Sequence, residues 1–152
     1  MAGVAWRRRA VGVACTWLLA VCGSAAGAIE VDVEFHNSID LSVCRNWTWA
    51  SGGQPAANYQ VEAALRGEIE AQLAKKGAAR SEEGAGCIVA TASRRDVIFP
   101  AGTLAIEIYD VASQRLAWSA VAAAIITDDE PKKVAKIARK AVKQAFKKFP
   151  KI

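Results

Sequence analysis

The clearest pattern after residue 28 is a strict alternation of apolar and polar residues. From Ile29 to Phe35 the apolar residues alternate with Glu30, Asp32 and Glu34. This period of two predicts a β-strand with one buried face, because successive side chains of a strand point to opposite sides of the sheet. The three carboxylates would then share the other face. We expect that face to be simply solvated, and an acid–base or metal cluster is the alternative.

Similar strand patterns recur later in the chain. Further strands are expected at 45–50, 87–93, 103–109 and 115–126. The last three follow one another through short turns, which predicts antiparallel pairing, and 79–86 is expected to be a polar loop. Trp47, Trp49 and Trp118 suit packing in the sheet and core, and lining a ligand site is the alternative.

Two segments have the apolar spacing of an amphipathic helix. The first begins after Asn58, a residue favoured at N-caps, and ends at Gly77, which can adopt the left-handed closing conformation. The second follows Asp128 and Asp129, either of which can cap it, and has Pro131 in its first turn. The order β-β-α-β-β-β-α predicts an α+β two-layer sandwich, an antiparallel sheet with two helices on one face.

Residues 1–28 have the three-part organisation of a cleavable signal peptide. Arginines at 7–9 precede an apolar run, and small residues at 26–28 form an A-x-A cleavage pattern. The apolar run is shorter than the ~20 residues that span a bilayer. We therefore expect an exported protein with one domain at 29–152, located in the periplasm or cell envelope. Lipidation of Cys22, which would tether the protein to a membrane, is the alternative.

Charge is distributed unevenly along the chain. The 20 basic and 15 acidic residues give a net charge of +5, and three of the arginines belong to the predicted signal peptide. Acidic residues outnumber basic ones over 29–130, whereas every charged residue beyond 130 is basic. This balance argues against nucleic-acid binding and predicts a basic terminal helix. Its basic residues are Lys132, Lys133, Lys136, Arg139, Lys140, Lys143, Lys147 and Lys148.

That helix has three interpretations, and one of them is that its basic side chains are attracted to the acidic rim of the chain's own sheet. Basic side chains around an apolar stripe can bind an anionic surface, either lipid or envelope polymer. The same stripe also lets a helix pack on a sheet, in which case the lysines only solvate the outer face.

The sequence carries no recognisable catalytic or cofactor motif. His36, the one histidine, lies near Ser42 and Cys44, but nothing like a nucleophile elbow surrounds them. The glycine pairs lack the lysine of a phosphate-binding loop, and the cysteines lack zinc-ligand spacing. We therefore expect no enzymatic activity, no cofactor and no metal. The expected role is structural or an interaction with an envelope protein, with anionic binding by the basic helix as the alternative.

Short motifs spread along residues 40–150 together resemble those of one bacterial family. The matching motifs are Asp40 to Trp49 against D-F-S-x-Y-K-T-Y-A-W, Lys76-Gly77 against K-G, Gly102-Thr103-Leu104 against G-T-L, Asp110 against D, Leu116-Ala117-Trp118 against L-V-W, and Phe149-Pro150 against F-P. The family consists of exported proteins, often lipoproteins, and is known as domain of unknown function 4136. The resemblance implies no known activity, cofactor or catalytic residue.

The chain departs from that family pattern at two cysteines. Cys44 stands where the family usually has an aromatic residue, and Gly86-Cys87 stands where it has an aspartate and an aliphatic residue. Two unusual cysteines in an oxidising compartment imply a Cys44–Cys87 disulfide that joins the second and third predicted strands, and two buried free thiols are the alternative. The large Val21 before Cys22 also departs from a good lipidation signal, which puts the family's usual lipid anchor in doubt.

Overall fold

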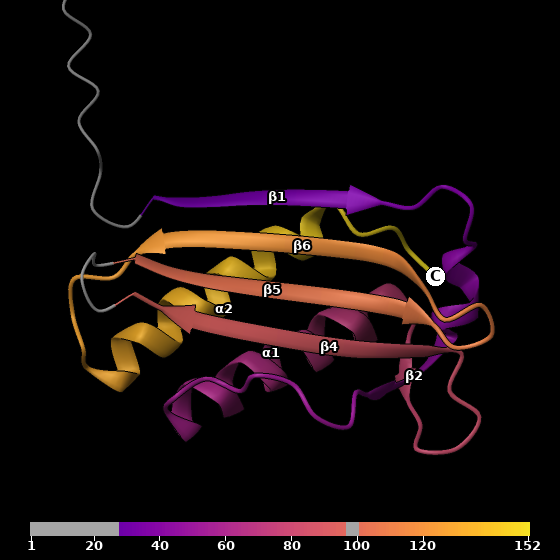
Figure 1. Cartoon of the computed structure of the whole chain (residues 1–152), viewed down its shortest axis with the longest axis horizontal. Helices are drawn as coiled ribbons and strands as arrows, with labels where there is room; N and C mark the ends of the chain where they lie inside the picture. The colour runs from indigo at the N-terminus through magenta and orange to yellow at the C-terminus, as the bar shows by residue number, and fades with distance from the viewer. Residues whose placement is uncertain (1–27, 97–100) are drawn as a thin grey trace, which may run out of the picture.

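The computed structural model of the chain describes residues 28–96 and 101–152. Two helices pack on one face of a six-stranded sheet (Figure 1). The elements are β1 (Ile29–Phe35), η1 (Leu41–Arg45), β2 (Asn46–Trp49), α1 (Tyr59–Lys76), β3 (Ala79–Arg80), β4 (Cys87–Arg95), β5 (Ala101–Asp110), β6 (Arg115–Ile125) and α2 (Pro131–Lys147). The predicted α+β class with two layers is confirmed. The predicted signal peptide, with Cys22, lies outside the described residues apart from its last position, and it stays a prediction.

The sheet is mixed, which corrects the prediction of a purely antiparallel sheet. Its strand order is β1-β6-β5-β4-β2-β3, and the pairs from β1 through to β4 are antiparallel. β2, however, runs parallel to both β4 and β3. The chain passes through α1 between β2 and β4, and such a helical crossover is what allows two strands to run in the same direction.

The segment 79–86 was expected to be a loop, but it contains β3, so the order becomes β-β-α-β-β-β-β-α. β3 has two residues, both exposed, and two residues are too few to display an alternating pattern. The short 3-10 helix η1 follows the first strand and places Cys44 as its one buried residue.

Helix α1 is capped as the sequence predicts. Oδ1 of Asn58 accepts hydrogen bonds from the backbone N–H groups of Gln60 (2.8 Å) and Val61 (3.4 Å), which have no partner within the helix. Gly77 closes the helix with φ of 98° and donates its N–H to the helix carbonyls. Both ends of α1 therefore follow from local sequence.

Helix α2 begins one residue later than a cap at Asp129 would place it, and two residues later than a cap at Asp128. Glu130 is the N-cap, with no side-chain capping hydrogen bond, and Pro131 occupies the first turn as expected. Oδ1 of Asp128 accepts from the N–H of Glu130 (2.9 Å) instead, outside the helix. Neither Asp128 nor Asp129 is therefore the N-cap. The Asp128 side chain is used in a turn that precedes the helix, and the helix begins at Pro131, whose φ is fixed near the helical value.

The core between sheet and helices is aromatic at one end. Trp118 of β6 packs on Phe146 and Phe149, with ring centroids 5.1 to 5.4 Å apart among the three. All three are almost fully buried, and Leu104, Ile106 and Ile108 of β5 face the same core. Trp47 is also buried, so Trp47 and Trp118 serve packing, the interpretation that the sequence favoured.

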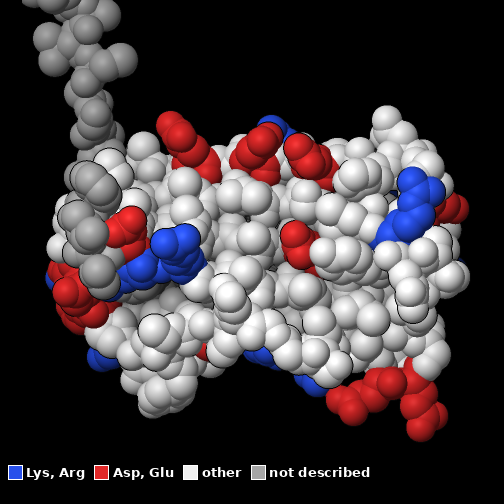
Figure 2. Space-filling model, in the orientation of Figure 1, with Lys and Arg blue, Asp and Glu red and all other residues white. Residues whose placement is uncertain are grey.

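The other face of the sheet is open to solvent (Figure 2). Figure 2 shows it as a mainly uncharged surface, with acidic side chains along the β1 edge. Glu30, Asp32 and Glu34 are all exposed, as the alternation predicts. Phe35 was expected to be buried, but it is 42% exposed because β1 ends there.

Candidate functional site

The basic residues of α2 form one continuous exposed surface. All eight are exposed, and most recur at spacings of three and four residues, which places them on one side of the helix. The opposite side carries the buried apolar residues, including Ala141, Val142 and Phe146. We call the exposed side, together with the C-cap residue Lys148, the basic face of α2; it consists of Lys132, Lys133, Lys136, Arg139, Lys140, Lys143, Lys147 and Lys148.

Most of the basic face has no internal counter-charge. Lys133 contacts Asp128 and also Glu130 (3.2 Å), and the hydrogen bonds to these carboxylates raise the pKa of Lys133. The hydrogen bond from Lys133 is also the main reason that the pKa of Asp128 is lowered. Lys143 lies 3.8 Å from a carboxylate oxygen of Glu68. Within residues 28–96 and 101–152, the other basic residues of this face make no ion pair.

Cys44 and Cys87 form a disulfide with their Cα atoms 4.8 Å apart. The bond joins η1 to the first residue of β4, and both cysteines are buried. Sequence reasoning placed the bond between the second and third predicted strands, and Cys44 lies instead in η1, just before β2. Because both sulfur atoms are bonded, the thiol that could have acted as a nucleophile beside His36 is not free.

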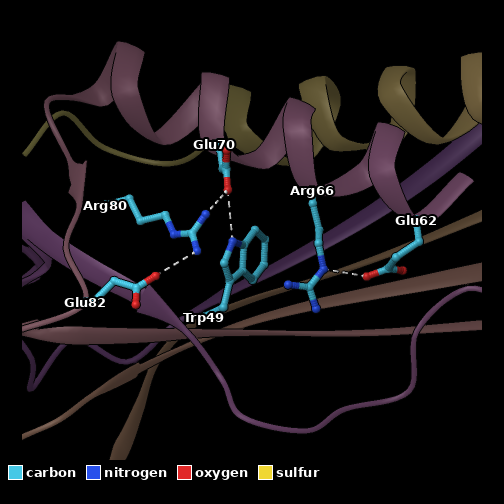
Figure 3. A network of polar contacts seen from close by, with 6 residues as sticks. All are labelled: Trp49, Glu62, Arg66, Glu70, Arg80 and Glu82. Carbon is cyan, nitrogen blue, oxygen red and sulfur yellow. Dashed lines mark hydrogen bonds and ion pairs between the residues drawn. The ribbon is translucent and has the colours of Figure 1, made fainter. Parts of the chain in front are cut away.

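A polar network fixes Trp49 between β2 and α1 (Figure 3). The indole Nε1 donates to Glu70 (3.0 Å), which also pairs with Arg80 (3.2 Å). The guanidinium of Arg66 lies 4.6 Å from the ring centroid of Trp49, and Arg66 pairs in turn with Glu62 (2.7 Å). Through the contacts of its indole with Glu70 and Arg66, Trp49 joins β2 to α1.

Replacing Trp49 by phenylalanine tests that structural role. We expect the free energy of unfolding to fall by about 1 kcal/mol, because a smaller aromatic ring remains while Glu70 loses one donor. Urea unfolding followed by circular dichroism measures the loss. Tyr59→Phe, which alters an exposed aromatic residue on the same helix, is the control and should leave stability unchanged. Equal stability of both variants would show that the indole hydrogen bond contributes nothing.

The remaining candidates do not converge on one centre. Ser42 Oγ donates to Asp40 (2.7 Å), and His36 is exposed. In the part of the chain that the structure describes, no three His, Cys, Asp or Glu side chains are placed to hold one metal ion. Over the same residues, no helix has both the length and the apolar character needed to cross a membrane.

Sequence reasoning missed one feature, a cavity between the helices and the sheet. Its volume is about 430 Å³, and its lining includes Ala122 and Ala124 of β6 and Ala138 of α2. Runs of alanine in two distant segments were the available signal. It could not be interpreted without knowing that the two segments face each other.

Comparison with known proteins identifies the family. A single family model matches residues 31–151, which is most of the chain. The chain belongs to the family described as domain of unknown function (DUF4136). The motifs of the sequence analysis had predicted this membership. No curated protein sequence matches this DUF4136 chain.

Solved structures share the fold of this DUF4136 domain at low sequence identity. A PDZ domain protein from Parabacteroides distasonis has a TM-score of 0.61 at 15% identity, over 82% of this chain and 36% of that one. The PelC dodecamer from Paraburkholderia phytofirmans has a TM-score of 0.56 at 12% identity, over 78% of this chain and 95% of that one. The DUF4136 chain thus spans about a third of the first protein and nearly all of the second. At these identities the likeness shows the fold alone.

Proposed function

We propose that this chain is an exported, non-enzymatic protein of the bacterial envelope that binds anionic lipid surfaces through the basic face of α2. The signal-peptide pattern at 1–28 supports export, and the membership of DUF4136 agrees with it. A binding role is favoured over catalysis because Cys44 is held in a disulfide and Ser42 is bonded to Asp40.

The observation that carries the proposal is the lack of counter-charges on the basic face. Elsewhere in the described part of the fold some basic residues, such as Arg66 and Arg80, pair with a carboxylate and others do not. On α2 only Lys133 and Lys143 do so among the described residues. Unpaired cations gathered on one side of a helix produce a local positive potential. Near an anionic membrane each contributes about 1 kcal/mol of attraction.

Flotation with lipid vesicles tests this proposal. We expect the protein to float with vesicles containing phosphatidylglycerol, to stay behind with pure phosphatidylcholine, and to be released as NaCl rises from about 0.1 M to about 0.5 M, because salt screens exposed charges. The double variant Lys136→Glu and Lys140→Glu should stay at background, since two attractions become two repulsions.

A matched variant separates this surface from overall charge. Arg45→Glu with Arg115→Glu changes the net charge by the same amount at two exposed sites outside α2, and it should still float. Equal loss of vesicle binding in both double variants would show that binding depends only on the total charge of the protein. Binding to an anionic polysaccharide without binding to vesicles would contradict the lipid assignment and favour an envelope polymer.

A further inference from the structure

The half-enclosed cavity lies under the N-terminal part of α2 and is lined mostly by apolar side chains. With its volume of about 430 Å³, it falls within the range of about 300–1,000 Å³ that is typical of small-molecule sites. Val61 and Leu65 of α1 and Leu104 of β5 form part of its wall. The charged residues in the lining are Arg94, Arg95 and Asp129.

The cavity exists because two elements change from aromatic residues to alanine along their length. The inward positions of β6 run from Trp118 to Ala122, while the buried side of α2 runs from Ala138 to Phe146. The aromatic ends coincide, as the ring contact between Trp118 and Phe146 shows, and so do the alanine ends, which both line the cavity. The space between β6 and α2 is therefore filled by aromatic rings at one end and left open as the cavity at the other.

The lining supplies one inward cationic group. Arg95 lies on the same face of β4 as the buried residues Cys87 and Val89, because alternate residues of a strand point to the same side. Its guanidinium lies 3.5 Å from the carbonyl oxygen of Ile126 and forms an ion pair with Asp129. The Asp129 side chain is 87% exposed, and ion pairs that exposed are weak, so another anion can take its place on Arg95.

We propose that this cavity binds an amphiphile with one aliphatic chain and one anionic head group, with the chain among the alanines and the head group on Arg95. The apolar wall suits an aliphatic chain, because burying it removes apolar surface from water on both sides. The guanidinium suits a carboxylate or a phosphate, with which it forms charge-assisted hydrogen bonds. This site is separate from the basic face of α2, which lies on the opposite side of that helix.

Fluorescence of dansyl-labelled undecanoic acid provides a direct test. We expect its emission to rise and shift to shorter wavelength with the wild-type protein, and myristate or lysophosphatidylglycerol to displace it. Displacement by myristate alone would assign the site to free fatty acids, and displacement by the lysolipid alone would assign it to lipid head groups. Failure of both to displace the probe would overturn the proposal.

Three variants locate the binding in the cavity. Ala138→Leu fills the hollow and should weaken myristate binding by at least about tenfold without lowering the thermal midpoint, because it occupies empty space. Ala74→Leu makes the same change at an exposed position of α1, and it should bind as the wild type does. Arg95→Gln should weaken myristate by about tenfold while leaving myristyl alcohol unchanged, because only the carboxylate uses the guanidinium.

The outcomes distinguish this site from the proposed membrane surface. The double variant at Lys136 and Lys140 should keep its affinity for monomeric myristate, and Ala138→Leu should still float with anionic vesicles. Equal binding of myristate by the wild type and Ala138→Leu would place the ligand elsewhere and overturn the proposal. So would an Arg95→Gln variant that loses myristate and its alcohol to the same extent.

Discussion

Replacing Cys44 and Cys87 together by alanine is expected to lower the free energy of unfolding by about 4 kcal/mol. The bond closes a loop with a sequence separation of 43 residues, and a crosslink over a loop of that length restricts the unfolded chain by about this amount. A domain of this size has only about 5–15 kcal/mol of stability. The loss is therefore a large share of the total.

Within the native state, removal of the disulfide should have its largest effect on η1. Cys44 is the one buried residue of that short helix, and Val43 beside it is 42% exposed. The hydrogen bonds from Ser42 to Asp40 are local to the segment and do not attach it to the sheet. The disulfide is thus the main link between η1 and β4, and we expect the amide protons of η1 to exchange faster without it.

Urea unfolding of the double variant and of the wild type, with and without reductant, measures the effect. The reduced wild type should resemble the double variant, while reductant should leave the double variant itself unchanged. The slope of the transition should rise as well, because the unfolded state becomes less compact. A loss below about 1 kcal/mol would contradict the role given to the crosslink.

Much of the fold follows from local patterns in the sequence. The alternation over 29–35 specifies β1, and Asn58 and Gly77 mark the ends of α1 through their capping chemistry. Membership of the family was evident from motifs in order, and two departures from its pattern led to the Cys44–Cys87 pair. The signals for β1 and for the two ends of α1 lie within a few residues of the structure that they specify.

The features that the sequence did not predict depend on contacts between residues distant in the chain. The parallel pairing of β2 with β4 is set by how α1 returns the chain, and the alternation within either strand carries no direction. β3 forms because its two residues meet β2, not because of its own sequence. The cavity likewise arises where the alanines of β6 face those of α2, and neither segment alone shows it.

Replacing Gly86 by alanine is expected to destabilise the fold by at least about 2 kcal/mol, because a side chain there meets backbone that cannot yield. A Cβ atom on Gly86 would lie 1.9 Å from the carbonyl oxygen of Val43. The residue is also fixed in place, since its N–H donates to Asn46 (2.7 Å) and its carbonyl accepts from Val111 (2.9 Å). Gly86 therefore cannot move away without breaking strand contacts.

Gly67→Ala is the matched control for this change. A Cβ at Gly67 meets nothing within 4 Å, and Gly67 lies in the middle of α1 at an exposed position. We expect it to raise the free energy of unfolding by about 0.5–1 kcal/mol, the usual gain of alanine over glycine in a helix. Urea unfolding of both variants should show a decrease in stability for Gly86→Ala and an increase for Gly67→Ala. Stability of Gly86→Ala equal to the wild type would show that the Val43 carbonyl gives way freely.

The destabilisation by Gly86→Ala and the destabilisation by loss of the disulfide should be coupled, because Val43 and Gly86 directly precede the two bonded cysteines. The disulfide holds η1 against the start of β4, and this holds the Val43 carbonyl against Gly86. Without the bond η1 can move outward, so Gly86→Ala should cost less in the background of the Cys44 and Cys87 alanine variant. A double-mutant cycle measures this, and an interaction energy above about 0.5 kcal/mol is expected. Strict additivity would mean that the strand contacts of Gly86, rather than the crosslink, maintain the close approach.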